Sequence, residues 1–250
     1  MNLLIIQARM GSTRLPGKVM KLLSEKPLLG FQVDRVAKSR LVNQLVVATT
    51  ENPEDNIIEN FCQQNNIQCF RGSDWDVLDR FYQVACKYNP KTVIRVTADC
   101  PLHHAEVIDF AISRFNELDV DYFSNSNHEP DFLEDGIDVE VFSYESLVAA
   151  WNDAKLLSER EHVTPFIKNS GNFTCHWQKF NAQYSFKLSV DTQEDFEMVQ
   201  EIISQSGNNA QITIPQICQL ITACPEILEI NKSSIINSGY KKSLENDRKI

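Results

Sequence analysis

The sequence lacks a long apolar run and an excess of positive charge. The longest early apolar run is Leu3–Ile6, which is too short for a signal peptide or a membrane span, so we expect a cytoplasmic protein. Among 250 residues, 24 are Lys or Arg and 34 are Asp or Glu, which gives a formal net charge of −10. An acidic chain repels polyanions, so neither nucleic acids nor anionic membranes are expected partners.

Several cysteine and glycine motifs are also missing. The seven cysteines form no Cys-x-x-Cys pair, which argues against a zinc ribbon or a redox pair. Neither the P-loop string Gly-x-x-x-x-Gly-Lys-[Ser/Thr] nor the dinucleotide string Gly-x-Gly-x-x-Gly occurs. A nucleotide site in this chain would therefore have to be built from a different loop.

The first half alternates short apolar runs with helical patterns. Strands are predicted at Leu3–Gln7, Leu45–Thr49 and Thr92–Thr97. Helices are predicted at Pro27–Arg40, Pro53–Asn66, Trp75–Tyr88 and Glu106–Leu118. This alternation indicates a three-layer α/β/α fold, in which helices cover both faces of a mostly parallel sheet. Ligands of such sheets bind beyond the carboxyl ends of the strands, here after Ile6, Ala48 and Val96.

The second half is less regular and predicts a small β-containing insertion. A loop is predicted over Tyr122–Asp138, one strand over Ile137–Phe142 and further strands within Phe173–Leu188. Helices are predicted at Tyr144–Lys155, Glu159–Lys168, Gln193–Gln205 and Pro215–Ala223. We expect one domain over residues 1–230 and a polar tail over residues 231–250.

The segment Gln7–Lys18, which reads QARMGSTRLPGK, reverses the local charge of this acidic chain. The first 24 residues carry no acidic side chain and four basic ones, Arg9, Arg14, Lys18 and Lys21. Two glycines permit tight turns, and two hydroxyl groups add hydrogen-bond donors: Gly11, Gly17, Ser12 and Thr13. The segment therefore predicts a cradle for a polyphosphate, with a solvated basic loop as the alternative.

QARMGSTRLPGK resembles the signature loop of the cytidylyltransferases that activate sugars, and among them the SpsF-type group named for spore-coat polysaccharide synthesis. The resemblance continues through FRGSDWDVLDRFYQVA, RVTADCPL, DGIDVEVF, SEREHVTPF and SVDTQEDF, from about residue 2 to residue 200. Acylneuraminate and 3-deoxy-manno-octulosonate cytidylyltransferases are more distant relatives with a similar loop. The resemblance implies a Rossmann-like fold of the nucleotide-diphospho-sugar transferase type. It also implies transfer of CMP from CTP to a sugar acid or related hydroxyl acceptor, with release of pyrophosphate, for surface glycan synthesis.

Nucleotidyl transfer joins two negatively charged partners, so it needs cations at the phosphates. The resemblance implies Mg²⁺ as the cofactor and assigns catalysis to Arg9, Arg14, Lys18 and Asp99. It also implies that Asp99, which follows the strand Thr92–Thr97, and Asp191 are metal ligands. The alternatives are a turn or helix cap for Asp99, and a helix start for Asp191 or Thr192.

The resemblance implies a nucleotide site that combines the first loop with a later segment. Its members are Ala8, Arg9, Gly11, Ser12, Thr13, Arg14, Lys18, Arg71, Gly72, Ser73 and Arg80. Arg80 equally fits an ion pair with Asp76, four residues earlier on the same predicted helix. The preference for CTP over other triphosphates comes from the resemblance alone.

Asp138 and Glu140 share one face of the strand predicted over Ile137–Phe142, because alternate residues of a strand point the same way. Such a pair can hold acceptor hydroxyls, orient an arginine or face solvent at a sheet edge. The resemblance favours an acceptor pocket, and it adds Arg160 and His162 to that pocket. A lone histidine is more often structural, which leaves the role of His162 open.

The resemblance also implies a homodimer, with about residues 137–188 as the acceptor and dimerisation region. One departure from the family pattern is the pair His103 and His104 after Pro101–Leu102, where an Asp is expected in many SpsF-type proteins. Two adjacent histidines without further ligand spacing are a poor zinc site. The acceptor therefore stays unidentified.

Two other functions fit parts of the sequence. A glycosyltransferase of similar topology would bind its metal with an Asp-x-Asp string after a strand, and Asp119–Val120–Asp121 has this form but is predicted at a helix end. A non-catalytic nucleotide-binding scaffold of a glycan pathway would keep the loop but could lose the metal ligands. The basic loop favours nucleotidyl transfer over the first function, and the presence of Asp99 with Asp191 argues against the second.

Overall fold

A seven-stranded mixed sheet forms the centre of the protein. The structure is a computed structural model that describes residues 1–127, 132, 134–181, 186–235, 243–245 and 247–250. The strands are β1 (Asn2–Gln7), β4 (Gln44–Thr50), β5 (Gln68–Gly72), β6 (Thr92–Thr97), β7 (Tyr122–Ser124), β8 (Glu140–Ser143) and β9 (Cys175–Trp177). Their order is β5-β4-β1-β6-β8-β7-β9. β5, β4, β1 and β6 are parallel, and β8 runs antiparallel to both of its neighbours.

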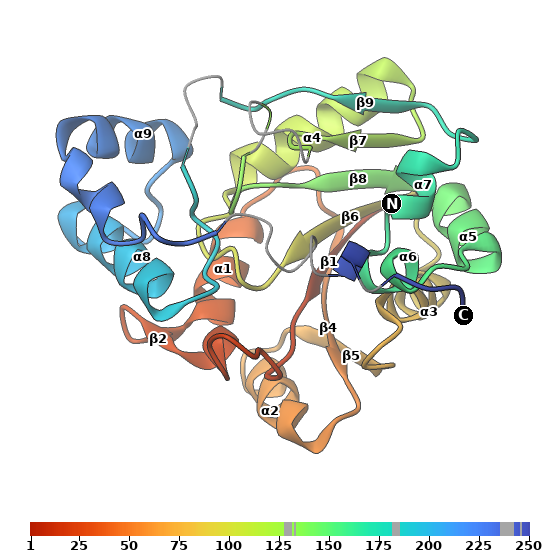
Figure 1. Cartoon of the computed structure of the whole chain (residues 1–250), viewed down its shortest axis with the longest axis horizontal. Coiled ribbons are helices and arrows are strands. Elements are labelled where there is room, and N and C mark those ends of the chain that lie inside the picture. Colours follow the sequence, from red (N-terminus) through yellow and green to blue (C-terminus); the bar gives the residue numbers. More distant parts are fainter. Residues whose placement is uncertain (128–131, 133, 182–185, 236–242, 246) are drawn as a thin grey trace.

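Helices cover both faces of this sheet. They are α1 (Leu28–Val36), α2 (Asn56–Gln64), α3 (Val77–Tyr88), α4 (Ala105–Leu118), α5 (Tyr144–Asp153), α6 (Leu157–His162), α7 (Pro165–Asn169), α8 (Gln193–Gln205) and α9 (Ile214–Ala223). A small hairpin of β2 (Leu22–Leu23) and β3 (Lys26–Pro27) precedes α1. In Figure 1, α8 and α9 lie together at one end of the molecule, and α3, α5 and α6 gather at the other.

Alternating side chains of β1 pack into two separate hydrophobic cores, one on each face of the sheet, which is why the fold has three layers. Leu4 and Ile6 pack in one core with residues of α1, α4, α8 and α9. Leu3 and Ile5 pack in the other core with residues of α3, α5 and α7. A strand that is apolar on both faces is typical of a sheet buried between helices, so the predicted three-layer α/β/α fold is confirmed.

Most predicted elements are present, and the exceptions have local causes. β6 and α8 have the predicted bounds. The loop predicted over Tyr122–Asp138 is wrong at its start, where three buried residues form β7. The helix predicted over Glu159–Lys168 is also wrong, because Pro165 cannot continue a helix and the chain turns at Val163 between α6 and α7. Within Phe173–Leu188 the described residues form the single strand β9, and residues 182–185 lie outside the described part.

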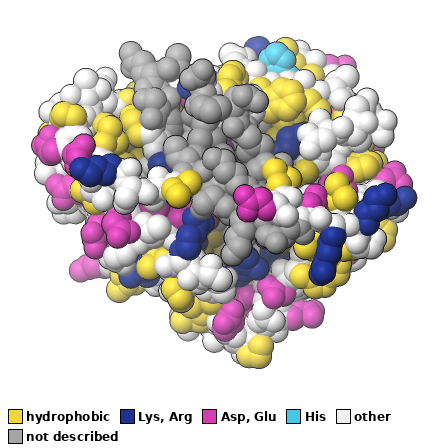
Figure 2. All heavy atoms as spheres, in the orientation of Figure 1, with side chains coloured by type: hydrophobic (Ala, Val, Ile, Leu, Met, Phe, Trp, Pro, Cys, Tyr) yellow, Lys and Arg dark blue, Asp and Glu magenta, His cyan; other side chains and the backbone are white. Residues whose placement is uncertain are grey.

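The carboxyl ends of β1, β4 and β6 meet at one edge of the sheet. Ala8 N–H donates to the Ala48 carbonyl at 3.0 Å, and Ala98 N–H donates to the Gln7 carbonyl at 3.0 Å. The loop after β1 and the turn after β6 therefore leave the sheet side by side. Figure 2 shows Lys and Arg side chains interspersed with Asp and Glu side chains on the face that it presents.

None of the helices in the described part of the chain has both the length and the apolar character needed to cross a membrane.

Candidate active site

A cleft of about 1160 Å³ opens at this edge of the sheet. Its walls come from the loop after β1, the end of β6, β8, the α6–α7 region and the segment before α8. The predicted site residues that line it are Ala8, Arg9, Gly11, Ser12, Thr13, Arg14, Lys18, Arg80, Asp99, Asp138, Glu140, His162 and Asp191. Four predicted site residues are not among its described lining residues: Arg71, Gly72, Ser73 and Arg160.

Hydrogen bonds to a buried aspartate and within the loop itself hold the loop after β1 in place. Met10 N–H donates to Asp55 Oδ1 at 2.7 Å, and Asp55 is buried. Gly17 has a φ of +69°, which glycine adopts without a Cβ clash, and its N–H donates to the Met10 carbonyl at 3.0 Å. These bonds close the loop and place Lys18 at the start of a short 3-10 helix, Lys18–Met20.

The Lys18 ammonium is shared by the two aspartates that the sequence predicted as partners. Lys18 Nζ donates to Asp99 Oδ2 at 2.9 Å, to Asp191 Oδ1 at 3.1 Å and to the Val190 carbonyl at 2.7 Å. Arg14 adds a second cation, with Nη2 2.7 Å from Asp191 Oδ1. Burial alone would raise the pKa of Asp99, but the nearby Lys18 outweighs it and holds that pKa well below its ordinary value. Two carboxylates thus converge on one cation, and oxygens of this kind are the protein ligands that Mg²⁺ prefers.

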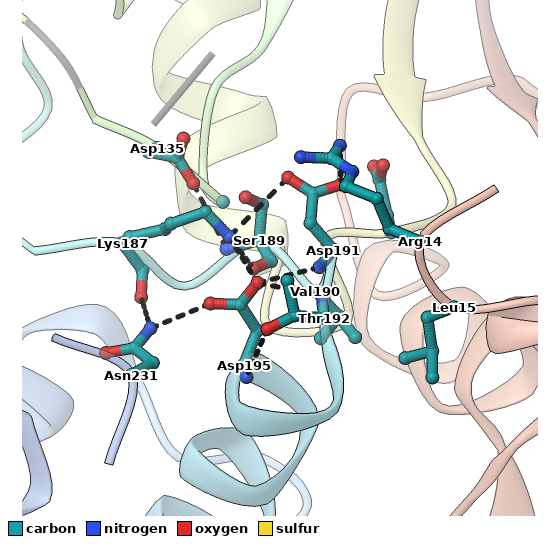
Figure 3. A network of polar contacts seen from close by, with 12 residues as sticks. Arg14, Leu15, Asp135, Lys187, Ser189, Val190, Asp191, Thr192, Asp195 and Asn231 are labelled. Carbon is teal, nitrogen blue, oxygen red and sulfur yellow. Dashed lines mark hydrogen bonds and ion pairs between the residues drawn. The ribbon is translucent and has the colours of Figure 1, made fainter. Parts of the chain in front are cut away.

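Main-chain contacts fix the segment before α8 against the turn after β6. Val190 N–H donates to the Asp99 carbonyl at 2.7 Å, so the two aspartates are joined through the backbone as well as through Lys18. Asp195 Oδ2 accepts from Asp191 N–H at 3.0 Å and from Lys187 Nζ at 2.7 Å. Figure 3 shows Asp191 between this network and the guanidinium of Arg14.

The helix start considered as the alternative at Asp191 or Thr192 is confirmed at Thr192, while neither Asp99 nor Asp191 is the capping residue in the described structure. α8 begins after Thr192, whose hydroxyl accepts from Asp195 N–H while the Asp195 carboxylate accepts from Thr192 N–H. α4 begins after His104, whose imidazole accepts an N–H of the first turn. Asp99 lies in the turn after β6, as one of its alternatives predicts, and both aspartates also contact Lys18 in the cleft.

Two arginines predicted at the site serve the scaffold instead. Arg71 donates to Glu59 Oε2 at 2.8 Å and to the Thr50 carbonyl at 2.8 Å, which ties β5 to α2 and β4. Arg160 Nε donates to both oxygens of Asp76 at 3.0 Å. The structure therefore holds both guanidinium groups away from the cleft lining.

Arg80 is buried beside the cleft. Its Nη1 donates to the Ser73 carbonyl at 2.6 Å, and its Nε has no hydrogen-bond partner among the described residues. Burial, reinforced by the charge of Arg9, lowers the pKa of Arg80 to about 10. The side chain of Asp76, the alternative partner considered for Arg80, is hydrogen-bonded to Arg160.

On the wall formed by β8 and α7, called here the β8 side, one carboxylate is shared by two cations. Glu140 makes ion pairs with Arg95 and with Lys168, whose Nζ is 3.2 Å from Oε1. Tyr122 Oη and Thr164 Oγ1 each donate to the same Oε1 at 2.6 Å. Burial alone would raise the pKa of Glu140, but Lys168 and Arg95 outweigh it and hold that pKa well below its ordinary value. Of the roles considered for this carboxylate, the contacts support the orientation of an arginine.

Two other groups on this side have displaced pKa values. Burial, reinforced by the charge of Glu140, raises the pKa of Asp138 to about 6. Burial, reinforced by the charge of Arg95, lowers the pKa of His162 to about 4. His162 is therefore neutral at pH 7 and only weakly basic, whereas Asp138 can exchange a proton close to neutral pH.

Val163 joins α6 to α7 in a strained conformation. Its φ and ψ are 70° and −53°, and Thr164 N–H donates to the His162 carbonyl across it at 2.8 Å, which is a γ-turn. A β-branched residue seldom occupies positive φ, and such strain costs about 1–3 kcal/mol. The turn lies between His162 and Thr164, which both line the cleft, so a strained residue adjoins the cleft on the β8 side.

Cys100, His103 and Asp138 form a buried polar cluster, with potential ligand atoms within 4.8 Å of one another. Both ring nitrogens of His103 are occupied, by Gln32 Nε2 at 2.9 Å and by the Asp138 carbonyl at 2.8 Å. Burial raises the pKa of the Cys100 thiol well above its ordinary value. Cys100 and Asp138 line the cleft, and His103 behind them has no free imidazole nitrogen for a metal in the described structure.

Comparison with known proteins shows the family of this chain. The family model described as Cytidylyltransferase matches residues 3–231. The chain belongs to the cytidylyltransferase family. The spore coat polysaccharide biosynthesis protein SpsF of Bacillus subtilis is similar to this cytidylyltransferase at 32% identity over 233 residues, covering 90% of this chain and 95% of that protein. An uncharacterized protein of Methanocaldococcus jannaschii is 34% identical over 242 residues, covering 95% of this chain and 97% of its own.

A solved structure gives the same result. The cytidylyltransferase from Leptospira borgpetersenii has a TM-score of 0.84 and 29% identity to this chain, and the alignment covers 94% of this chain and 98% of that one.

The Asp-x-Asp string Asp119–Val120–Asp121 of the present chain lies outside the described cleft lining. Asp119 follows the end of α4, and the Asp121 carboxylate accepts from Thr174 N–H at 2.8 Å. Neither aspartate is among the described residues of the cleft, which removes the support for a glycosyltransferase.

Sequence reasoning about this cytidylyltransferase missed Arg95 and Lys168. Arg95 interrupts the apolar strand β6, and a charge inside a buried strand needs a partner or a function, so that signal was available. Lys168 gave no comparable signal, because its position depends on the turn at Val163 and on the short helix α7 that follows.

Proposed function

We propose that this cytidylyltransferase transfers CMP from CTP to a sugar acid or related hydroxyl acceptor, for the synthesis of a surface glycan. In this reaction the acceptor oxygen attacks the α-phosphate, the bond to the β-phosphate breaks, and pyrophosphate leaves while the hydroxyl proton is released. The observation that carries the proposal is the position of Lys18, which comes from the basic loop and contacts both Asp99 and Asp191.

The basic loop would bind the triphosphate. Arg9, Arg14 and Lys18 line the cleft, and a bound triphosphate would offer them anionic oxygens in place of their present carboxylate partners. Asp99 and Asp191, released from those cations, would hold Mg²⁺. Bound there, Mg²⁺ would neutralise phosphate charge and make the α-phosphate easier to attack. The protein would act by alignment and charge neutralisation, without a covalent intermediate.

Arg80 would contribute to the binding of the base. Its buried guanidinium lines the cleft, and its Nε has no hydrogen-bond partner among the described residues. A pyrimidine presents hydrogen-bond acceptors that such a donor can satisfy, and an unpaired buried donor costs free energy until it is satisfied. This donor suits an acceptor on any base, and the choice of CTP is supported by the family.

A pyrophosphate-release screen tests the proposal. CTP, UTP, ATP and GTP are each offered with ulosonic acids, nonulosonic acids and sugar phosphates, with Mg²⁺ or with EDTA. We expect release only with CTP, one acceptor class and Mg²⁺. Preference for another triphosphate, or full activity in EDTA, would contradict the nucleotide or the metal assignment respectively.

The quaternary structure is tested separately. We propose a homodimer through about residues 137–188, as the family resemblance implies. Sedimentation of the protein as a monomer at micromolar concentration would contradict it.

A further inference from the structure

The described residues 243–245 and 247–250, called here the tail segment, lie against the start of α6, which forms part of one wall of the cleft. Leu157 N–H donates to the Arg248 carbonyl at 2.9 Å. Figure 1 shows this dark blue end of the chain beside α6. The family model ends at residue 231, so these contacts are not part of the region that it matches.

The first turn of α6 takes its hydrogen-bond acceptors from the tail segment. The N-cap residue is Leu156, whose side chain has no acceptor, whereas Ser, Thr, Asp and Asn normally serve at this position. The Glu159 carboxylate accepts from Leu156 N–H, just before the helix, and leaves the N–H groups of the first turn to other acceptors. One is the Arg248 carbonyl, and another is Asp247 Oδ1, which accepts from Ser158 N–H at 3.0 Å. Asp247 Oδ2 accepts from the Ser158 hydroxyl at 2.7 Å.

The helix α6 is too short to keep its position without such contacts. It has six residues, and a helix of that length depends on packing against its neighbours. Arg160 Nε fixes its buried face to Asp76 at the start of α3, and the tail segment fixes its first turn. Burial alone would raise the pKa of Asp247, but two hydrogen bonds from Ser158 outweigh it and lower that pKa below its ordinary value. Asp247 therefore accepts both bonds as a carboxylate at neutral pH.

Other side chains of α6 face the cleft, and the tail segment reaches the same wall. Leu157, Glu161 and His162 line the cleft. Ser243 also lines it, and its hydroxyl donates to Glu161 Oε2 at 2.7 Å. A carboxylate accepts hydrogen bonds at both of its oxygens, so Glu161 Oε1 can accept from a hydroxyl group of a bound molecule. The tail segment thus holds α6 at one end and orients a carboxylate of the cleft at the other.

From this geometry we infer that the tail segment belongs to the active site and that Asp247 is a positioning residue for the acceptor. By holding the first turn of α6, Asp247 keeps Glu161 where it can accept a hydrogen bond from an acceptor hydroxyl. The inference rests on the proposed nucleotidyl transfer, since it assigns the α6 wall to the hydroxyl acceptor. The triphosphate is assigned to the loop after β1, so CTP binding is expected to depend little on the tail segment.

Hydrogen exchange in the full chain tests the hold on α6. Asp247→Ala removes both acceptor oxygens, whereas Asp247→Asn keeps one side-chain oxygen for Ser158 N–H. The matched control Glu245→Ala changes an exposed residue of the same tail segment. Because exchange reports local opening, we expect the amides of α6 to exchange ten-fold or more faster in Asp247→Ala, and within three-fold of wild type in the other two variants. Thermal unfolding confirms that each variant is folded.

Steady-state kinetics separate positioning from a general loss of stability. Pyrophosphate release is measured with Mg²⁺, CTP and the acceptor that gives release in the screen described above. In Asp247→Ala we expect the KM of the acceptor to rise ten-fold or more while the KM of CTP stays within two-fold. Asp247→Asn should restore most of the affinity for the acceptor, and Glu245→Ala should keep it. A purely structural role would lower the melting temperature and leave the KM of the folded enzyme unchanged.

The two measurements distinguish this inference from the proposed function. Unchanged exchange in α6, an unchanged acceptor KM in folded Asp247→Ala, or an equal rise in the KM of CTP would overturn the inference while wild-type release supports the transfer reaction. Faster exchange of α6 in Asp247→Ala, without release by the wild type from any acceptor, would support the positioning of α6 by Asp247 and contradict the transfer reaction.

Discussion

The two sides of the cleft are built on opposite arrangements of charge. Near the loop after β1, one ammonium, Lys18, is shared by two carboxylates, Asp99 and Asp191. On the β8 side, one carboxylate, Glu140, is shared by two cations, Arg95 and Lys168. In the proposed reaction the Lys18 centre would release its central cation to a phosphate and bind the metal. The central carboxylate of the other centre sits in a strand and receives two further hydrogen bonds, from Tyr122 and Thr164.

The largest effect is expected for Asp99→Asn, which removes one charge from the Lys18 centre but keeps an oxygen for its hydrogen bond. We expect turnover to fall on the order of 10²–10³-fold, because a charged group aligned at the phosphates is lost. Pyrophosphate release measures this, and thermal unfolding checks the fold. Asp153→Asn, an exposed residue at the end of α5, is the control. Activity within two-fold of wild type would end the metal assignment of Asp99.

Lys18→Met tests whether the central cation of the first side is exchangeable. The two carboxylates would lose their resident cation and could bind Mg²⁺ instead. MgCl₂ without nucleotide should therefore raise the melting temperature of the variant more than that of wild type. The difference corresponds to about 1–3 kcal/mol of unfolding free energy. The specificity constant for CTP should fall roughly 100-fold. Lys21→Met, three residues later and outside the cleft lining, serves as control. An identical response of wild type and variant to MgCl₂ would show that Lys18 and the metal do not share a site.

Glu140→Gln tests the central carboxylate of the second side. It would leave two buried cations without their common partner, which costs about 3–5 kcal/mol of unfolding free energy. Since the folded pKa of Glu140 is depressed, its stabilisation is complete above the unfolded value near pH ~4.3 and is lost as the pH falls through the folded pKa. Urea unfolding at pH 7 and in acid should thus give a large difference that shrinks at low pH. A loss no greater than that of Glu145→Gln, an exposed residue of α5, would refute the central role.

The smallest effect is expected for His162→Gln. The folded pKa of His162 is about 4, below the unfolded value of ~6.5, so falling pH protonates the unfolded chain first and lowers stability between these values. The side chain is 23% exposed, so the contribution is at most about 3 kcal/mol. Removing the imidazole should flatten the pH dependence of urea unfolding between pH 7 and 4 by up to that amount. Curves of wild type and variant that stay parallel over this range would show that His162 titrates normally.

The alternation of strands and helices and the basic loop after β1 could be predicted from the sequence, because both depend on local patterns. β6 and α8 are set by apolar periodicity and by the capping pair Thr192 and Asp195. The basic loop could be located because its charge is opposite to that of the rest of the chain. The convergence of Asp99 and Asp191 could be predicted only from family resemblance, since it is made by a long-range backbone bond.

The β8 side could be predicted only in part. The strand predicted over Ile137–Phe142 begins only at Glu140, so Asp138 lies before it and strand alternation does not relate the two carboxylates. The partners of Glu140 come from three other elements. The γ-turn at Val163 could not be foreseen, because valine at positive φ contradicts its own local preference. Tertiary contacts decide such a position, and the placement of Lys168 depends on it.

The bond between Lys18 and the Val190 carbonyl joins residues 172 positions apart in the chain. During synthesis Lys18 and the loop after β1 are therefore made 172 residues before their counterpart at Val190. A growing polypeptide that stops short of Val190 has the loop and most of the sheet but an unfinished catalytic centre. Nucleotide binding by arrested nascent chains of increasing length should thus switch on abruptly, and the length at which it does so reports when this enzyme becomes competent.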